Sequence, residues 1–387
     1  MKGNVRAHRL QAKWLTCLLA WLVVVGYGLS AVGCRQQAAG YAADGGDTIP
    51  MRYAQNLLMV SYDDGVLVEL KDPWHEGSVL RRYWLGKGHR TDATTIAVPL
   101  QRSVVFNTAH ASLIGMLGAT GQVAGVADLK YMQLPEIQRR VQQGMVRDCG
   151  DGMSPDVERI VEMRADAILL SPFENSGGYG RLEKLGIPLI ECADYMETSA
   201  LGRAEWMRFY GMLYGCGTEA DSLFSVVENN YLELKQLVVE KVVDTQRPTV
   251  LTERLTGGTW YVPGGRSTMG RLLADAGAHY PWADDGHSGS LALSFETVFS
   301  LAADADIWLM NHSDQRPLTA SWLSAEHHGY GRLKALQTKH VYYVNSLQVP
   351  YFEEVPFRPD YHLRDLIQLF HPGLVEGQPR YYRVITD

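Results

Sequence analysis

The side chains with the greatest scope for chemistry in this chain are aromatic, cationic and imidazole groups in loops that follow expected strands. Aromatic rings offer large flat contact areas, and arginine forks suit carboxylate or catecholate oxygens. Together these side chains predict a ligand-binding surface. The candidate ligand-binding residues are Asn107, His110, Tyr131, Phe173, Trp260, Tyr261, Arg266, His312, Tyr351 and Arg358.

Several of these side chains also have structural interpretations. Trp260 and Tyr261 are equally compatible with packed loop anchors, and Arg358 with a structural cap. A histidine at a helix start, such as His110, more often has a structural role than a ligand role. Capture of a bare metal needs three or four converging ligands, and only His110 and His312 stand at suitable loop ends. We therefore predict neither a resident metal nor a cofactor.

Signatures of catalysis are absent from the sequence. It contains no Gly-x-Ser-x-Gly elbow and no His-Glu-x-x-His pair. The glycine pair in Ser176-Gly177-Gly178-Tyr179 belongs to no phosphate-binding fingerprint and is interpreted as a loop. Glu326-His327-His328 is interpreted as a solvated surface run, because adjacent residues on a helix point in different directions. The chain is therefore not predicted to be an enzyme.

The elements that must position the candidate loops include a helix–strand unit that occurs twice. One copy runs from Ser154 to Leu170 and the other from Leu293 to Leu309. Each opens with a helix-start signal, continues as a short amphipathic helix, and ends in Ala-Asp before an apolar run typical of a buried parallel strand. Such a repeat predicts two similar α/β lobes. In open α/β sheets, ligands bind beyond the carboxyl ends of the strands.

Other elements are expected before and between these units. Leu57–Tyr62 and Val66–Leu70 flank Asp63-Asp64-Gly65, which is a strong hairpin signal. The segment from Leu201 to Val243 keeps a helical period and is broken at two glycines, so we expect two helices. The second would contain about 25 residues and be roughly 37 Å long.

The first part of the chain has the pattern of an export signal. Basic residues precede an apolar run from Trp14 to Val25, and small residues then precede Cys34. The segment Ala31-Val-Gly-Cys34 resembles a lipobox and implies a lipid on Cys34, although Ala31 stands where leucine is preferred. Ordinary secretion with a free Cys34 is the alternative.

Charge and cysteine usage exclude other classes of protein. The net charge is −7 and both signs are mixed along the chain, so no basic stripe offers a nucleic-acid surface. Cys149, Cys192 and Cys216 lie beyond the expected lipobox, and their spacing fits no zinc pattern. We expect buried thiols, with at most one disulfide.

The repeated unit resembles the substrate-binding proteins of ABC importers for iron–siderophores, haem and cobalamin, which are class III periplasmic binding proteins. Gly186-Ile-Pro-Leu-Ile190 and Gly270–Ala278 add to the likeness. The resemblance implies an α/β fold of two Rossmann-like lobes joined by a long rigid α-helix, with an N-terminal β-hairpin extension. It also implies that Glu158 and Glu296 dock on a permease. Solvated helix-face carboxylates are the alternative.

The resemblance also orders the chain into segments. They are a lipoprotein signal peptide at 1–33, a flexible tether at 34–50, a β-rich N-terminal extension at 51–98, an N-terminal binding lobe at 99–200, bridging helices at 201–246 and a C-terminal binding lobe at 247–387.

The function implied is that of an exported protein, lipid-anchored to the membrane and facing the periplasm. It would capture an iron chelate, either a ferric siderophore or haem, and deliver it to an ABC permease and its ATPase. A cobalamin-binding protein of a vitamin B12 importer is the alternative, because corrinoids suit an aromatic, mostly neutral cleft. Less favoured are a haem- or tetrapyrrole-processing lipoprotein enzyme and a scaffold or adhesin lipoprotein.

Overall fold

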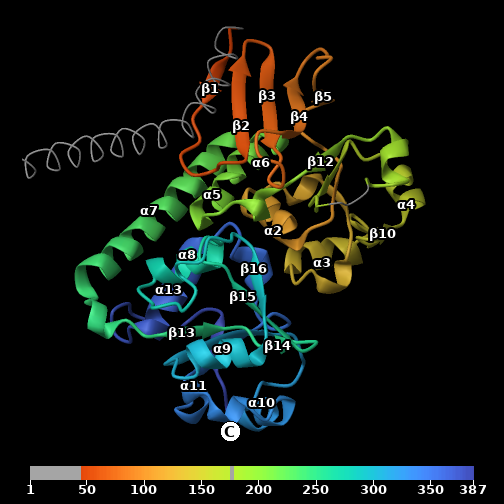
Figure 1. Ribbon diagram of the computed structural model, residues 1–387. Helices are drawn as coiled ribbons and strands as arrows, with labels where there is room; N and C mark the ends of the chain where they lie inside the picture. The colour runs from red at the N-terminus through yellow and green to blue at the C-terminus, as the bar shows by residue number, and fades with distance from the viewer. Residues whose placement is uncertain (1–44, 175–177) are drawn as a thin grey trace, which may run out of the picture.

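The computed structural model describes residues 45–174 and 178–387, so Cys34 and the expected signal peptide lie outside the described residues. Two lobes lie one above the other, and a long helix runs along one side from the upper lobe to the lower (Figure 1). A separate sheet lies on top of the N-terminal lobe. The predicted class, two α/β lobes with a helical bridge and a β extension, is confirmed.

The N-terminal lobe is built on a five-stranded parallel sheet in the order β12-β11-β6-β7-β8. Its strands are β6 (Ser103–Val105), β7 (Val123–Val126), β8 (Arg147–Asp148), β11 (Ala167–Leu170) and β12 (Leu189–Glu191). Its helices include α2 (Thr108–Met116), α3 (Pro135–Gln142) and α4 (Val157–Glu162). β11 is buried along its whole length, as expected for an apolar run covered on both faces.

The C-terminal lobe has a four-stranded sheet in the order β13-β17-β18-β19, in which only β19 is antiparallel. These strands are β13 (Val250–Thr252), β17 (Ile307–His312), β18 (Val341–Asn345) and β19 (Tyr382–Val384). The surrounding helices are α8 (Thr268–Asp275), α9 (Phe295–Ala302), α10 (Ala320–Glu326), α11 (Lys334–Gln337), α12 (Tyr351–Glu354) and α13 (Pro359–Phe370).

The repeated Ala-Asp has the same role in both lobes. Asp166 accepts hydrogen bonds from the backbone amides of Gln101 and Arg102, just before β6. Asp306 accepts one from the amide of Thr249 at 2.8 Å, just before β13. Each aspartate therefore fixes the start of the neighbouring parallel strand, which explains why the pair recurs before β11 and β17.

The segment that carries the candidates Trp260 and Tyr261, which were expected in a loop, instead contains a strand. β15 (Thr259–Pro263) pairs with β14 (Leu255–Thr256) and β16 (Ser290–Leu293) in a small antiparallel sheet. Gly257 and Gly258 form the turn between β14 and β15 with positive φ angles of 59° and 85°. Glycine adopts these angles without a steric penalty, so here the glycines mark a hairpin.

The bridge consists of three helices, where two were expected. They are α5 (Ala200–Glu205), α6 (Met207–Tyr214) and α7 (Gly217–Lys241), and the additional break lies at the buried Trp206. α7 reaches the C-terminal lobe, where Tyr231 donates a hydrogen bond to Asp275 and Asn230 donates one to Asp360. These bonds fasten the long helix to α8 and α13.

The N-terminal extension is a five-stranded sheet that contains the predicted hairpin. Its strands are β1 (Asp47–Ile49), β2 (Leu57–Tyr62), β3 (Gly65–Lys71), β4 (Val79–Gly86) and β5 (Thr94–Ile96). The loop between β1 and β2 is held by two buried carboxylates: Glu205 of α5 accepts bonds from the amides of residues 52–54, and Glu197, just before α5, from those of residues 55 and 56. The sheet is therefore fixed to the bridge.

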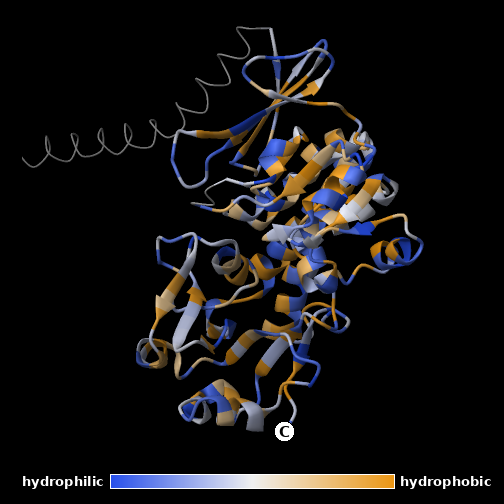
Figure 2. Ribbon diagram, turned by 90° about the vertical axis from the view of Figure 1, so that its right-hand side faces the viewer, coloured by the Kyte–Doolittle hydropathy of each residue, from blue (hydrophilic) through white to orange (hydrophobic). Residues whose placement is uncertain are grey.

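Hydrophobic residues concentrate on the strands and on inward-facing parts of the helices in both lobes (Figure 2). Cys149 and Cys192 are buried free thiols, as predicted, whereas Cys216 is free but partly exposed. Among the described residues, no helix combines the length and the apolar character needed to cross a membrane.

Candidate ligand-binding site

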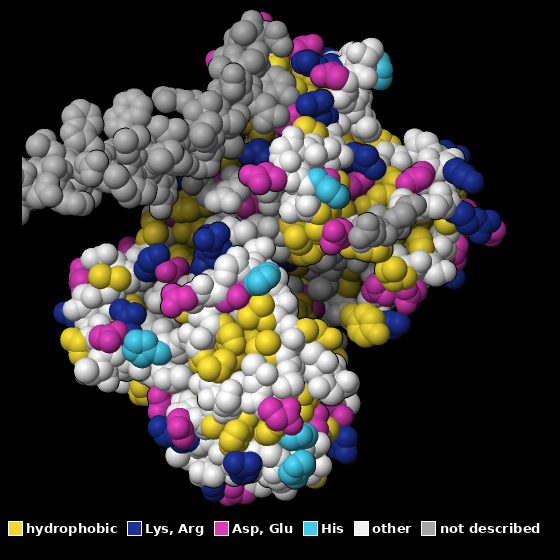
Figure 3. Space-filling view, viewed as in Figure 1, with side chains coloured by type: hydrophobic (Ala, Val, Ile, Leu, Met, Phe, Trp, Pro, Cys, Tyr) yellow, Lys and Arg dark blue, Asp and Glu magenta, His cyan; other side chains and the backbone are white. Residues whose placement is uncertain are grey.

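A cavity of about 450 Å³ lies at the carboxyl ends of β13 and β17 in the C-terminal lobe. Its volume falls in the usual range for small-molecule sites. Figure 3 shows hydrophobic side chains at the surface on both sides of the boundary between the lobes. The polar and aromatic side chains that line the cavity are Thr252, Glu253, Arg254, Thr256, Tyr261, Ser290, Asn311, Tyr351, Phe352 and Tyr382.

Glu253 has an unusual backbone in this cavity. It directly follows β13 and has a φ of 59°, a left-handed conformation that costs a non-glycine residue on the order of 1–3 kcal/mol. Its carbonyl accepts a bond from Trp308 Nε1 at 2.6 Å, and Asn311 Nδ2 donates to its Oε1 at 2.8 Å. Burial raises the pKa of the Glu253 carboxyl. The fold therefore holds this carboxyl in the cavity wall at a conformational cost.

A neutral polar cluster lies beside Glu253. His362 Nε2 is 3.3 Å from Tyr351 Oη and 3.0 Å from Tyr382 Oη. Burial lowers the pKa of His362 to about 3, so its imidazole is uncharged at neutral pH. Burial also raises the pKa of both tyrosines. These three side chains thus present hydroxyl groups and rings but no charge.

A second cavity of about 220 Å³ adjoins the first and shares Met269, Tyr351 and Phe352 with it. It extends to Arg203 on α5 in the bridge. Arg203 donates to the buried Asp194 at 2.9 Å, and Arg254 in the first cavity donates to Glu326 at 2.7 Å. Each arginine that lines these cavities is therefore already paired with a carboxylate.

The N-terminal lobe meets the site at α12. Glu353 Oε1 of α12 accepts a hydrogen bond from Thr108 Oγ1 at 3.2 Å and another from the amide of Gln133 at 3.3 Å. Tyr131 lies two residues before Gln133 and is 60% exposed. The loop that carries Tyr131 therefore borders the C-terminal lobe close to Tyr351 and Phe352.

The predicted site residues fall into an exposed and a buried set. Tyr131, Phe173 and Tyr261 expose 60%, 45% and 47% of their surfaces, which leaves rings free for contact. Asn107 is partly buried; it caps α2 and donates to Ser171 at 3.1 Å. Tyr351 lines both cavities.

Trp260, His110 and His312 are fully or almost fully buried. Trp260 packs among Phe295, Trp308 and Tyr330, and its indole donates to the Thr252 carbonyl at 2.9 Å. His110 Nε2 lies 2.8 Å from Asp194 Oδ1, and His312 Nε2 lies 2.9 Å from the Arg316 carbonyl. The structure supports the structural interpretation of these side chains, and we do not include them in the site proposed below.

The two predicted arginines differ in their surroundings. Arg266 is exposed in the loop between β15 and α8. Arg358 is paired with Asp360 at 2.7 Å and stacks 3.5 Å from the Tyr361 ring centroid, at the start of α13. Because Asp360 also accepts a bond from Asn230 of α7, Arg358 lies at the junction with the bridge, away from the cavity.

Glu158 and Glu296 occupy equivalent positions in the two lobes. Each is the exposed second residue of its helix, α4 or α9. Both helices have a side-chain N-cap: Asp156 accepts a bond from Arg159 N, and Ser294 accepts one from Thr297 N. Hydrogen bonds from its own amide and from Ser294 lower the pKa of the Glu296 carboxyl. Both carboxylates are thus available at the surface.

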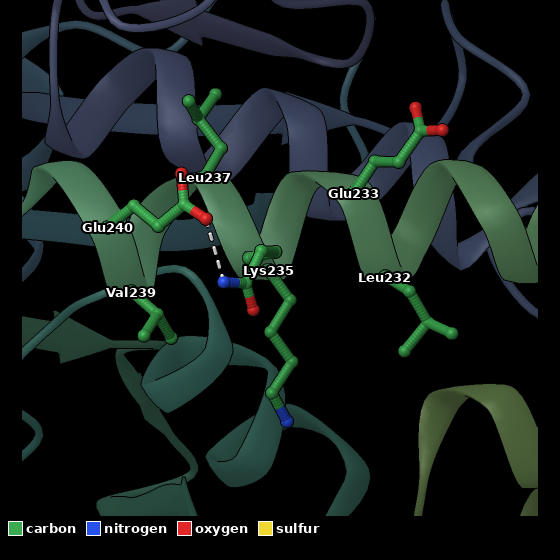
Figure 4. A pocket seen from close by; sticks show the side chains of 7 residues that line it. Leu232, Glu233, Lys235, Leu237, Val239 and Glu240 are labelled. Carbon is green, nitrogen blue, oxygen red and sulfur yellow. Dashed lines mark hydrogen bonds between the residues drawn. The ribbon is translucent and has the colours of Figure 1, made fainter.

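Other features carry less weight as sites. A hollow of about 620 Å³ follows the outer face of α7, but one helix supplies its whole wall and the side chains point to different sides (Figure 4). His327 and His328 follow the end of α10 and stack at 4.8 Å. Within residues 45–174 and 178–387, no three His, Cys, Asp or Glu side chains are grouped to hold a metal ion.

Sequence reasoning missed several residues that line the cavity, chiefly Glu253, Asn311 and Phe352. Glu253 directly follows β13, so the rule that ligands bind beyond strand ends could have found it. Phe352 is next to Tyr351 in the sequence. Asn311 directly follows the apolar residues 307–310 of β17, beside the candidate His312, so the same rule could have found it.

Two α/β lobes joined by a long helix, with a cavity at the strand ends of the C-terminal lobe, are the architecture of a ligand-binding protein. A family model described as periplasmic binding protein matches residues 104–346, more than half of the chain. The chain belongs to this family, whose members are solute-binding proteins of transport systems.

Individual relatives agree with this assignment. An uncharacterized lipoprotein of Methanocaldococcus jannaschii is 25% identical over 298 residues, which are 74% of this chain and 69% of the relative. A periplasmic heme-binding protein of Pseudomonas aeruginosa is similar in structure, with a TM-score of 0.57 and 16% identity over 74% of this chain and 98% of that one. A possible iron-binding protein of Staphylococcus epidermidis has a TM-score of 0.55 and is 18% identical, over 70% of this chain and 99% of that one. These likenesses in structure show the fold.

Proposed function

We propose that this protein captures an iron chelate, a ferric siderophore or haem, between its two lobes and delivers it to an ABC permease. The observation that carries the proposal is the cavity at the carboxyl ends of β13 and β17, with the exposed Tyr261 and Phe352 in its wall. Flat apolar rings of this kind suit a bulky chelate. The similar proteins of P. aeruginosa and S. epidermidis are described as heme-binding and iron-binding.

The proposed site combines the two adjoining cavities with the Tyr131 loop opposite them. Tyr261, Tyr351 and Phe352 supply one wall. Tyr131 and Phe173 are exposed on the N-terminal lobe and supply the other. Asn107 lies at the start of α2, close to the contact between α12 and Thr108, and Arg266 stands in an adjacent exposed loop.

A corrinoid is the second candidate, because the arginines of both cavities are already paired. An anionic ferric siderophore would therefore depend on Arg266 in the adjacent loop, whereas an amide-bearing cobalamin would need no cation.

We also propose that Cys34 carries the lipid anchor and that the protein faces the periplasm. The M. jannaschii relative is described as a lipoprotein, which supports an envelope location. Permease docking through Glu158 and Glu296 completes the proposal and is supported by their matched, exposed positions on α4 and α9.

Calorimetric titration of the purified exported protein tests ligand capture. The panel is ferric siderophores, haem, cyanocobalamin and free zinc. Saturable binding of one chelate is expected, and Phe352→Ala should weaken it at least about tenfold, since it removes an aromatic contact that the bound chelate would cover, worth roughly 1.4 kcal/mol. Leu232→Ala, on the outer face of α7, should leave affinity unchanged. No binding across the panel would refute the proposal.

A further inference from the structure

We propose that Glu253 sets the charge class of the ligand, so that the part of the chelate entering the C-terminal cavity carries amide, hydroxyl or ammonium groups and no carboxylate. The inference rests on the proposed function, because it assumes that the cavity binds a chelate. It adds a specificity-determining residue and a ligand chemistry to that function.

The first observation is where the carboxyl group lies. Glu253 and Asn311 line the same cavity, and Asn311 Nδ2 donates to Glu253 Oε1 at 2.8 Å. The backbone amide of Asn311 also interacts with this carboxyl. Asn311 thus orients the carboxyl from one side, and a ligand in the cavity can donate a further hydrogen bond to it, because a carboxylate accepts several.

The second observation is that no other free charge surrounds Glu253. Arg254, its neighbour in the chain, donates to Glu326 at 2.7 Å. The titratable side chains of the other elements near Glu253 are Tyr280, Tyr351 and Tyr382, and burial raises the pKa of each. They are neutral hydroxyls at neutral pH. The charge that a ligand meets in this cavity is therefore that of Glu253.

The third observation is that the fold holds Glu253 in place at a cost. Its φ of 59° is one that glycine would adopt without strain, and its carbonyl is fixed by Trp308 Nε1. Strained non-glycine residues of this kind concentrate at ligand sites. A carboxylate on a ligand would face like-charge repulsion at this position, whereas an N–H or O–H donor would be bound.

Matched pairs of chelates test the inference. Each pair shares one metal core with and without carboxylates: haem dimethyl ester against haem, cyanocobalamin against its monocarboxylic acid, and ferrioxamine B against its N-succinyl derivative. For the core that binds, we expect the carboxylate-free member to bind at least about tenfold more tightly at pH 7.5. Glu253→Gln, which is isosteric and keeps an acceptor for Asn311, should reduce this ratio to about threefold or less.

Glu240→Gln is the matched control, because it removes the same charge from the outer face of α7 and should keep the wild-type ratio. A wild-type ratio near one, or one that Glu253→Gln leaves unchanged, would overturn the inference while ligand capture stood. Failure of all six probes to bind would instead count against the proposed function. The wild-type ratio needs no variant, so misfolding of Glu253→Gln cannot hide the result.

Discussion

At the scale of single residues, Glu158 and Glu296 are the side chains that we expect to connect this protein to its permease. Both are exposed at the second position of a capped helix, and neither lines the ligand cavity. We expect Glu158→Ala/Glu296→Ala to leave ligand affinity within about twofold of the wild type and to reduce cellular uptake at least about tenfold. Radiolabelled-metal uptake checks the second effect.

Glu162→Ala/Asp304→Ala is the control for this experiment. It removes two other exposed acidic residues, one from each lobe, and should leave uptake unchanged. If both double variants supported wild-type uptake, the docking role of Glu158 and Glu296 would have to be abandoned.

Trp260 shows how a residue type can suggest a binding role while its environment gives it a structural one. Its ring is fully buried among three other aromatic rings. Trp260→Ala should lower the free energy of unfolding by about 3–5 kcal/mol, because it leaves a large cavity. Urea unfolding followed by circular dichroism measures this loss. Tyr261→Ala, one residue away and half exposed, should cost less than about 1 kcal/mol; comparable losses would contradict the assignment.

At the scale of elements, α12 holds the two lobes together through Glu353. Burial raises the pKa of Glu353 in the folded protein. The folded protein therefore binds the Glu353 proton more tightly than the unfolded chain does. Protonated Glu353 stabilises the fold most below the ordinary glutamate pKa, and this stabilisation is lost as pH rises through the raised pKa. Glu353→Gln keeps an acceptor for Thr108 and Gln133 without a charge. Its stability relative to wild type should therefore increase as pH rises through that window.

Chemical unfolding of wild type and Glu353→Gln at a series of pH values checks this sign. Glu353→Ala serves as the contrast, because it removes both hydrogen bonds that Glu353 accepts from the N-terminal lobe and should be destabilised by about 1–3 kcal/mol. A stability difference between Glu353→Gln and wild type that did not change with pH would show that Glu353 does not titrate as described.

The elements that could be predicted from sequence are those whose signals are local. β11 and β17 follow from apolar runs after Ala-Asp, and the hairpin of β2 and β3 follows from Asp63-Asp64-Gly65. The small sheet of β14, β15 and β16 was missed because β16 pairs with a strand some thirty residues away across an intervening helix. The left-handed backbone of Glu253 could not be predicted, because nothing in a glutamate side chain signals a positive φ.

At the scale of the whole molecule, α7 restricts how far the lobes can move. The helix has 25 residues and is bonded to α8 and α13, while α12 contacts α2 directly. A continuous helix resists bending, so the lobes should close on a ligand by only a small angle.

We expect a chelate that binds to change the radius of gyration by less than about 1 Å, against a total of about 20 Å for a compact chain of this size. Small-angle X-ray scattering with and without the chelate measures it. Gln236→Pro, which interrupts α7 on its exposed face, should enlarge the change; a change of several ångströms in the wild type would show that the bridge is a hinge.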